Sequence, residues 1–199
     1  MRLTYRKKRP RFLLLSKSDE DLVALARGGS TGAFDELVAL HQDRVFALAY
    51  RMLGNTEDAA DAQQETFVRA WRSLRKFRQD AAFSTWLHRI TVNACLSRKR
   101  KADREITAVF DEDAVGHSAR SGAVACLEKT ETAAVVRKVV DGMPAHYRAL
   151  IVLREIEGRP FEEIAAILGC SVASARTRAS KARKMLRDRM RPYFAEEDK

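Results

Sequence analysis

The sequence is poor in the residues that support β-sheets, disulfide frameworks and membrane spans. Aromatic residues make up only 8% of its 199 positions, and there are three cysteines, four prolines and nine glycines. Cys95, Cys126 and Cys170 lie far apart without a CxxC or Cys/His spacing, which indicates reduced, buried thiols rather than metal ligands or disulfides. No apolar run approaches the roughly 20 residues of a membrane span, and the stretch 12–15 is too short for the core of a signal peptide. We therefore expect a soluble, cytoplasmic and mainly helical protein.

The sequence also lacks the patterns of a nucleic-acid enzyme. It contains no P-loop, no metal-binding combination of His and Cys, and no pair of carboxylates in a catalytic context. Positive charge, in contrast, is abundant: there are 37 Lys and Arg and 27 Asp and Glu, for a formal net charge of +10. This surplus indicates a polyanionic partner, either nucleic acid or an acidic membrane surface, unless it only reflects a solvated basic surface. We expect neither an enzyme nor a cofactor or metal site.

The first half of the chain has the apolar spacing of helices. It follows a basic tail over residues 1–17, which we expect to be disordered, and Ser18 can cap the first helix. Apolar residues then recur at intervals of three and four, interrupted by Gly54 and by the polar loop 79–82. The pattern predicts one helical domain over residues 18–104, with helices over 18–27, 31–53, 56–74 and 83–100. It places Trp71 on the inner, apolar face of the third of these helices.

The spacing is lost in the middle of the chain and then returns. Residues 105–127 contain an acidic run and several Gly and Ser residues, which predicts a flexible linker. Periodic apolar residues over 128–191 predict a second helical domain, followed by a tail over 192–199. The predicted fold class is all-α, with two small helical domains joined by the flexible linker.

Within the second domain, residues 161–183 have the pattern of a helix-turn-helix. Gly169 can adopt the left-handed conformation that ends a short apolar helix, and Ser171 can cap the helix that follows. In this motif the second helix lies in the major groove of DNA. That helix is rich in cations, namely Arg176, Arg178, Lys181, Arg183, Lys184, Arg187, Arg189 and Arg191. A basic helix directly after a helix-turn-helix favours DNA binding over a merely solvated surface.

Two blocks of sequence resemble one known family. Residues 142–187 (GMPAHYRALIVLREIEGRPFEEIAAILGCSVASARTRASKARKMLR) are similar to region 4 of bacterial sigma factors. Residues 57–71 (EDAADAQQETFVRAW) and 83–94 (FSTWLHRITVNA) resemble the polymerase-binding and promoter-melting parts of sigma region 2. No segment resembles sigma region 3, and in this respect the sequence is similar to the extracytoplasmic-function (ECF) group of sigma factors. The resemblance implies a sigma factor that binds core RNA polymerase and promoter DNA, is controlled by an anti-sigma factor, and has no small-molecule substrate.

The resemblance assigns the helix over 57–72 to core polymerase, through its polar face. That face carries Asp61, Gln64, Glu65, Arg69 and Arg72. Polar helix faces usually serve only as solvent-exposed surface, so the functional interpretation depends on the family match. Ala62 and Gln63 depart from the family pattern, which favours apolar residues there, and this weakens the expected local packing.

The resemblance assigns the loop near residue 80 and the following helix to the −10 element. Opening DNA requires unpaired bases to be held by pockets or stacking, and phosphates by cations. We expect Trp86 to serve the core more than the DNA, and we expect the run 98–101 to contact phosphates. The candidate −10 residues are Arg78, Phe83, Trp86, Arg89, Asn93, Arg98, Lys99, Arg100 and Lys101.

The last helix is assigned to the −35 element by the same resemblance. We expect base contacts from Arg176, Thr177 and Ser180 and phosphate contacts from neighbouring cations. The candidate −35 residues are Ser174, Arg176, Thr177, Arg178, Ser180, Lys181 and Arg183. Ala175 and Ala179 are smaller than the family's usual aliphatic residues, so they bury less apolar area.

A conventional transcription regulator with a C-terminal helix-turn-helix is the main alternative. It would need a sensory or dimerising front domain, and the motifs over 57–94 argue against one. Tight binding to a duplex operator without polymerase would favour the regulator, whereas weak binding to promoter duplex alone would favour the sigma factor.

Overall fold

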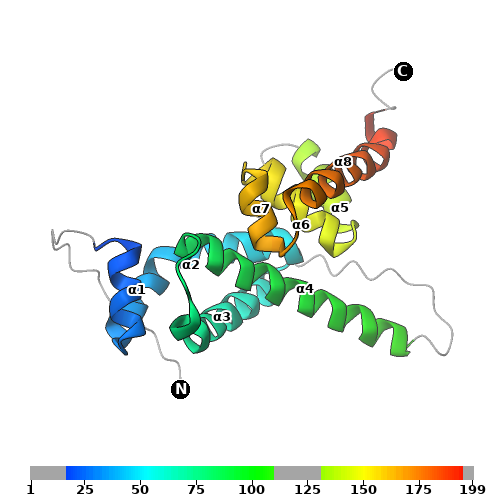
Figure 1. Ribbon diagram of the computed structural model, residues 1–199. Helices are drawn as coiled ribbons and strands as arrows, with labels where there is room; N and C mark the ends of the chain where they lie inside the picture. Colours follow the sequence, from blue (N-terminus) through cyan, green and yellow to red (C-terminus); the bar gives the residue numbers. More distant parts are fainter. Residues whose placement is uncertain (1–16, 110–130, 195–199) are drawn as a thin grey trace.

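The computed structural model describes residues 17–109 and 131–194, and every regular element in these ranges is a helix (Figure 1). The all-α prediction is thus confirmed for the described part of the chain. None of its helices is both long and apolar enough to cross a membrane. The first group of helices is α1 (Asp19–Arg27), α2 (Thr31–Leu53), α3 (Thr56–Ser73), the 3-10 turn η1 (Leu74–Lys76) and α4 (Phe83–Val109). The second group is α5 (Glu131–Asp141), α6 (Ala145–Ile151), the π-helical turn η2 (Val152–Ile156), α7 (Phe161–Leu168) and α8 (Val172–Phe194).

The front domain is a bundle in which α2, α3 and α4 pack on one another and α1 packs on α2. Ser18 begins α1 with a capping box: its hydroxyl accepts from the Asp21 amide at 3.2 Å, and the Asp21 carboxylate accepts from the Ser18 amide at 3.3 Å. Gly54 ends α2 in the left-handed conformation, with φ 83°. The buried residues at the α1 end of this bundle include Leu22, Leu37, Leu74 and Leu87.

Two features of this domain differ from the sequence prediction. Helix α4 continues to Val109, nine residues beyond the predicted end at Arg100 and five residues into the expected linker. The added segment contains good helix formers and neither Gly nor Pro, so nothing in it ends the helix. Trp71, expected on the inner face of α3, is 38% exposed and packs at the edge of the core against Phe34, with ring centroids 4.9 Å apart. The remainder of the predicted linker, 110–127, lies outside the described residues.

The rear domain contains the predicted helix-turn-helix, formed by α7 and α8. Gly169 ends α7 in the left-handed conformation (φ 64°), and Ser171 caps α8 by accepting a hydrogen bond from the Ser174 amide at 3.2 Å. Both predictions are confirmed. Ala175 and Ala179 are buried, at positions where the family that the sequence resembles usually has larger aliphatic residues. Their short side chains allow α8 to pack closely on α6 and α7.

Substituting Gly169 tests the turn of this motif. Gly169→Ala is expected to lower the free energy of unfolding by about 1 kcal/mol, because an L side chain is strained at positive φ. Gly32→Ala is the matched control: a methyl group there meets nothing within 4 Å in the first turn of α2, and alanine favours helix by about 0.5–1 kcal/mol. Urea unfolding of the full chain measures both. Shifts of the same sign in the two variants would contradict the prediction.

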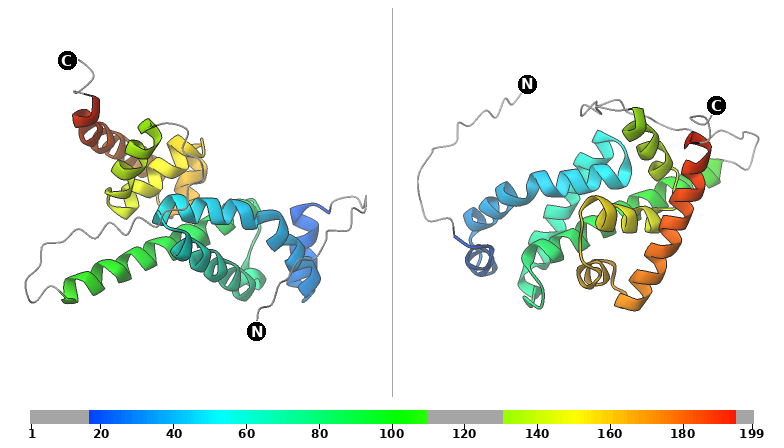
Figure 2. Two further views of the ribbon diagram at one scale, coloured as in Figure 1. Left: turned by 180° about the vertical axis from the view of Figure 1, so that it is seen from behind. Right: turned by 90° about the horizontal axis from the view of Figure 1, so that it is seen from above.

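The two domains pack directly against each other, with α5–α8 gathered on one side of the front bundle (Figures 1 and 2). One apolar cluster runs across the boundary and includes Met52 of α2, Val92 and Cys95 of α4, and Leu150 of α6. Burial raises the pKa of the Cys95 thiol to about 12. This agrees with the prediction of a buried, unpaired thiol at this position. Cys170 is partly exposed, and Cys126 lies outside the described residues.

Candidate nucleic-acid interface

Helix α8 presents most of the predicted −35 residues to solvent. Ser174 is partly buried, whereas Arg176, Thr177, Arg178, Ser180, Lys181 and Arg183 are exposed. Two of the arginines contact their own domain: Arg176 lies 3.5 Å from Glu162, and Arg183 donates to Glu155 at 2.8 Å. Exposed ion pairs of this kind are weak, so both arginines remain available to another anion.

Other cations of α8 have no carboxylate partner in the part of the chain that the structure describes. No ion pair joins Arg178, Lys181, Lys184 or Arg187 to a carboxylate within residues 17–109 and 131–194, and all four side chains are exposed. These cations follow the turn of the helix-turn-helix directly, on the helix that this motif inserts into the major groove. The surface suits the phosphates of duplex DNA.

A second exposed stripe runs along α4. Arg89, Asn93 and Arg100 recur at helical spacing and are exposed, and Lys101 beside them is exposed as well. Trp86 lies one turn earlier and is partly buried, because its ring packs 4.8 Å from that of Phe77. The stripe combines cations, an amide and a partly exposed indole ring, which are groups that hold single-stranded nucleic acid.

The preceding loop adds a further cation. Arg78 is exposed and lies 3.3 Å from Asp80. Between them Gln79 has a positive φ of 61°, which marks a tight turn before α4. Lys99, also predicted here, is partly buried.

Two predicted −10 residues occupy places that do not suit DNA contact in this conformation. Phe83 is only 5% exposed, and its ring packs edge-on against His41 and Phe77 at centroid distances of 5.3 and 6.1 Å. We therefore reassign Phe83 to the core, where its apolar ring is removed from water. The other residue, Arg98, is turned toward α3.

Arg98 lies among three carboxylates of α3. Its guanidinium nitrogens are 3.8 Å from Asp58, 3.3 Å from Asp61 and 3.5 Å from Glu65. With its side chain only 30% exposed, Arg98 joins α4 to α3 instead of extending the phosphate-binding run. The reason is electrostatic: the acidic face of α3 is the nearest source of counter-charge.

The predicted polymerase-binding residues do share one face of α3. Asp61, Gln64, Arg69 and Arg72 are exposed, Glu65 is partly buried, and Arg69 donates to Glu65 at 2.5 Å. Val68, which is not among the predicted residues, is half exposed on the same face. Its spacing of four from Gln64 and from Arg72 was the signal that could have identified it.

The departures at positions 62 and 63 are accommodated in the fold. Ala62 is fully buried against α2 and α4 in the shared apolar cluster. Gln63 donates to the Gln42 carbonyl at 2.7 Å and so joins α3 to α2. The expected loss of local packing is absent at these two positions.

Comparison with known proteins identifies both domains. Residues 37–105 match the family description Sigma-70 region 2, and residues 133–186 match Sigma-70, region 4. The RNA polymerase sigma-H factor of Pseudomonas aeruginosa is 32% identical over 193 residues, which is 92% of this chain and 100% of that protein. The ECF RNA polymerase sigma factor SigE of Mycolicibacterium smegmatis is 38% identical over 176 residues, 82% of this chain, and the match spans 64% of that longer relative.

Solved structures agree with the sequence matches. CnrH, in complex with the cytosolic domain of CnrY, is 31% identical, with a TM-score of 0.59 over 86% of this chain and 96% of that one. The sigma factor RpoE of Bartonella quintana, in complex with the anti-sigma factor NepR, is 27% identical, with a TM-score of 0.59 over 79% of this chain and 96% of that one. The chain belongs to the sigma-70 family of RNA polymerase sigma factors, within its extracytoplasmic-function group.

Proposed function

We propose that this sigma factor binds core polymerase, the −10 element and the −35 element through three separate exposed surfaces. Region 2 binds core RNA polymerase through the polar face of α3 and holds the opened −10 element along α4. Region 4 binds the −35 element through α8. The observation that carries the proposal is the row of exposed cations on α8, directly after the turn of the helix-turn-helix. The protein acts as a transcription initiation factor and not as an enzyme. Its proposed location is the cytoplasm, which contains both RNA polymerase and the chromosome.

The α8 surface is proposed to separate sequence recognition from simple phosphate binding. Residues near the start of a recognition helix reach base edges first, which assigns Arg176, Thr177 and Ser180 to the bases. Arg can donate two hydrogen bonds to one guanine, whereas Lys acts mainly as a point charge for phosphates. Arg178 and Lys181 are therefore assigned to phosphates, which position the domain.

The α4 surface is proposed to hold separated strands. Trp86 offers a partly exposed ring for stacking, Asn93 offers an amide for a base edge, and Arg89 and Lys101 offer charge for phosphates. Phe83 and Arg98 are left out of this surface because both are engaged inside the domain.

Charge reversal on α3 tests the polymerase surface. The double variant Asp61→Lys and Glu65→Lys is expected to weaken binding to core polymerase about tenfold or more, because complementary charges at an interface become like charges. Titration of fluorescently labelled sigma factor with core polymerase measures this. Arg98→Gln is the matched control, since it removes a cation that pairs with both carboxylates inside the domain and leaves the carboxylates in place. An equal loss from the control would assign Asp61 and Glu65 to domain structure alone.

In vitro transcription tests the function as a whole. Core polymerase reconstituted with the full chain is expected to initiate transcription from specific fragments of a genomic DNA library. Core polymerase alone is expected to show no such specific initiation. A protein that bound a duplex operator tightly without polymerase, and supported no initiation from any fragment, would be a conventional regulator instead.

An anti-sigma factor is the proposed regulatory partner. Two structural relatives were solved in complexes, one with the cytosolic domain of CnrY and one with the anti-sigma factor NepR. The docked arrangement of regions 2 and 4 supports this proposal, because a partner that binds both domains would hold them in contact. Co-purification with candidate partners and loss of polymerase binding in their presence would test it.

A further inference from the structure

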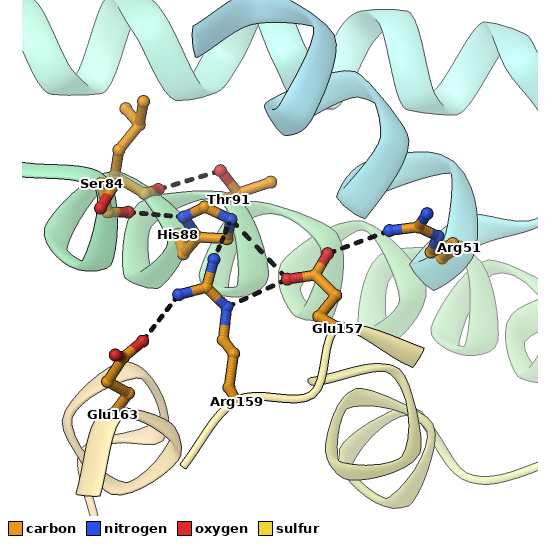
Figure 3. Close-up of polar contacts among 8 residues, drawn as sticks. Arg51, Ser84, His88, Thr91, Glu157, Arg159 and Glu163 are labelled. Atoms are coloured by element: carbon orange, nitrogen blue, oxygen red, sulfur yellow. Dashed lines mark hydrogen bonds and ion pairs between the residues drawn. The ribbon is translucent and has the colours of Figure 1, made fainter. Parts of the chain in front are cut away.

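A cluster of charged side chains joins the two regions beside their shared apolar core. We call it the His88 cluster, and it comprises Arg51, His88, Glu157, Arg159 and Glu163. Arg51 and His88 come from region 2, and the other three come from region 4 (Figure 3). Arg159 Nη2 lies 2.9 Å from His88 Nε2, and Arg51 Nη1 donates to Glu157 Oε1 at 3.2 Å. Both of these hydrogen bonds cross the boundary between the regions.

The hydrogen bonds of this cluster determine the protonation state of His88. Its Nδ1 lies 2.5 Å from the Ser84 carbonyl oxygen, which can only accept, so Nδ1 carries a proton. Its Nε2 lies beside the Arg159 guanidinium, which can only donate, so Nε2 is an unprotonated acceptor. His88 is thus neutral, and the two guanidinium groups of the cluster balance the carboxylates of Glu157 and Glu163.

A second proton on His88 would disrupt this arrangement. It would place an N–H on Nε2, facing the N–H of Arg159 at hydrogen-bond distance. The Glu157 carboxylate is 3.8 Å from Nε2, but it already accepts from Arg159 Nε at 3.0 Å and from Arg51. Water cannot solvate the added charge, since the His88 side chain is only 4% exposed. Charged His88 therefore disfavours the contact between the regions.

This contact must open for the proposed function, on which the inference rests. The −35 and −10 elements are about 25 base pairs apart, or about 85 Å along duplex DNA at about 3.4 Å per base pair. Compact domains of these lengths are each about 30 Å across, so two domains in contact cannot reach both elements. We propose that the His88 cluster is a protonation-controlled switch: neutral His88 holds region 4 on region 2, and protonated His88 releases it.

The charges that face His88 support the direction of the switch. Burial is the main cause that lowers the pKa of His88 from its ordinary value of 6.5. The Ser84 carbonyl raises the pKa, Arg159 lowers it, Glu157 raises it and His41 of α2 lowers it, and the net direction is downward. His41 itself lies 3.0 Å from Asp19 of α1.

The sign of the pH effect follows from that direction. In the open state His88 is solvated and titrates near 6.5, whereas in the closed state its pKa is lower. Below pH 6.5 the open state binds more protons than the closed state, so acidification favours opening. The contribution of neutral His88 to the free energy of closure is complete well above pH 6.5. It is lost as the pH falls through this value toward the lowered pKa of His88 in the closed state.

The separation of the two regions can be measured in the full chain without polymerase. Spin labels at Glu36→Cys of α2 and Arg187→Cys of α8 report the distance between regions by double electron–electron resonance, since both positions are exposed. Cys95→Ala, Cys126→Ser and Cys170→Ser remove the competing thiols, and Cys95 is included because it lies in the cluster at the boundary that opens. Lowering the pH from 7.5 to 5.5 is expected to raise the ratio of open to closed molecules, by about tenfold at most for one histidine whose pKa in the open state has its ordinary value.

Variants identify the group responsible. His88→Gln is expected to remove the pH response, and His146→Gln, which changes an exposed histidine of α6, is expected to retain it. Arg159→Gln is expected to raise the open population about tenfold or more at pH 7.5, because it breaks the bond to His88 and the pairs with Glu157 and Glu163. Circular dichroism of each variant checks that the helices remain folded.

Three results would overturn the switch. The first is a distance distribution that does not change between pH 7.5 and 5.5. The second is a pH response that persists in His88→Gln. The third is an Arg159→Gln variant whose open population at pH 7.5 is no larger than that of the wild-type protein. None of these results depends on transcription. If the switch fails while in vitro transcription succeeds, the sigma factor assignment stands; if transcription fails while the pH response is present, the proposed function is wrong and the switch is not.

Discussion

Replacing Arg148 with alanine is expected to destabilise the docked form of the protein by about 3 kcal/mol. Arg148 of α6 is the largest side chain in the structure that is fully buried, at 0% exposure. Its Nη1 donates to the Met52 carbonyl oxygen at the end of α2, 2.9 Å away, and lies 3.3 Å from Asp141 of α5. The substitution deprives both acceptors of this donor and leaves a cavity at the boundary between the regions. Both effects act against closure.

Urea unfolding and small-angle scattering of the full chain would measure this effect. We expect a lower unfolding midpoint and a larger radius of gyration for Arg148→Ala than for the wild-type protein. Arg51→Ala is the matched control, because Arg51 also crosses the boundary but is 41% exposed, and its pair with Glu157 contributes about 1 kcal/mol at most. Equal shifts from the two substitutions would show that burial of Arg148 contributes nothing beyond an ordinary ion pair.

Local features of the fold could be predicted from the sequence because they depend on neighbouring residues. Ser18 and Asp21 form a capping box, which two residues three positions apart are enough to specify. Gly169 and Ser171 likewise end one helix and begin the next, so the helix-turn-helix was predictable with its boundaries. The exposed cations of α8 follow from the same turn, since apolar residues must occupy the inner face.

The roles of individual charged residues were less predictable because counter-charges come from distant segments. Arg98 belongs to a run of four basic residues, and by sequence it is equivalent to Lys101. Only the folded chain brings it to Asp61, 37 residues earlier, and turns it away from the DNA surface. The burial of Phe83 was unpredictable for the same reason: its contacts with His41 and Phe77 depend on tertiary packing.

The contact between the regions is the part that sequence patterns could not predict. Periodicity identifies which face of a helix is apolar, but not which other domain covers it. Val92 and Cys95 were compatible with burial inside region 2 alone, yet they belong to a cluster that extends into region 4. His88 and Arg159 are separated by 71 residues, and no sequence pattern indicates that their side chains are in contact.

Neutralising the cations of α8 is expected to produce the largest loss of DNA binding. The triple variant Arg178→Gln, Lys181→Gln and Lys184→Gln removes three exposed charges and buries no new group. Each phosphate contact releases about 0.9 counterion from duplex DNA, so the slope of log affinity against log salt is expected to decrease in magnitude by about 2.7. Affinity of the holoenzyme for promoter DNA at low salt is expected to fall about a hundredfold. Fluorescence anisotropy at several salt concentrations measures both quantities.

A matched triple variant in region 2 separates local contacts from net charge. Arg27→Gln, Arg75→Gln and Lys76→Gln remove the same number of exposed cations from α1 and η1, which lie outside the proposed DNA surfaces. Long-range attraction depends on total charge and would weaken equally in both variants, whereas phosphate contacts are lost only from α8. Because Arg176 stays in place, the α8 variant is also expected to keep its preference for the −35 sequence over a scrambled one. Equal salt slopes in the two triple variants would mean that α8 attracts DNA through net charge and does not contact its phosphates.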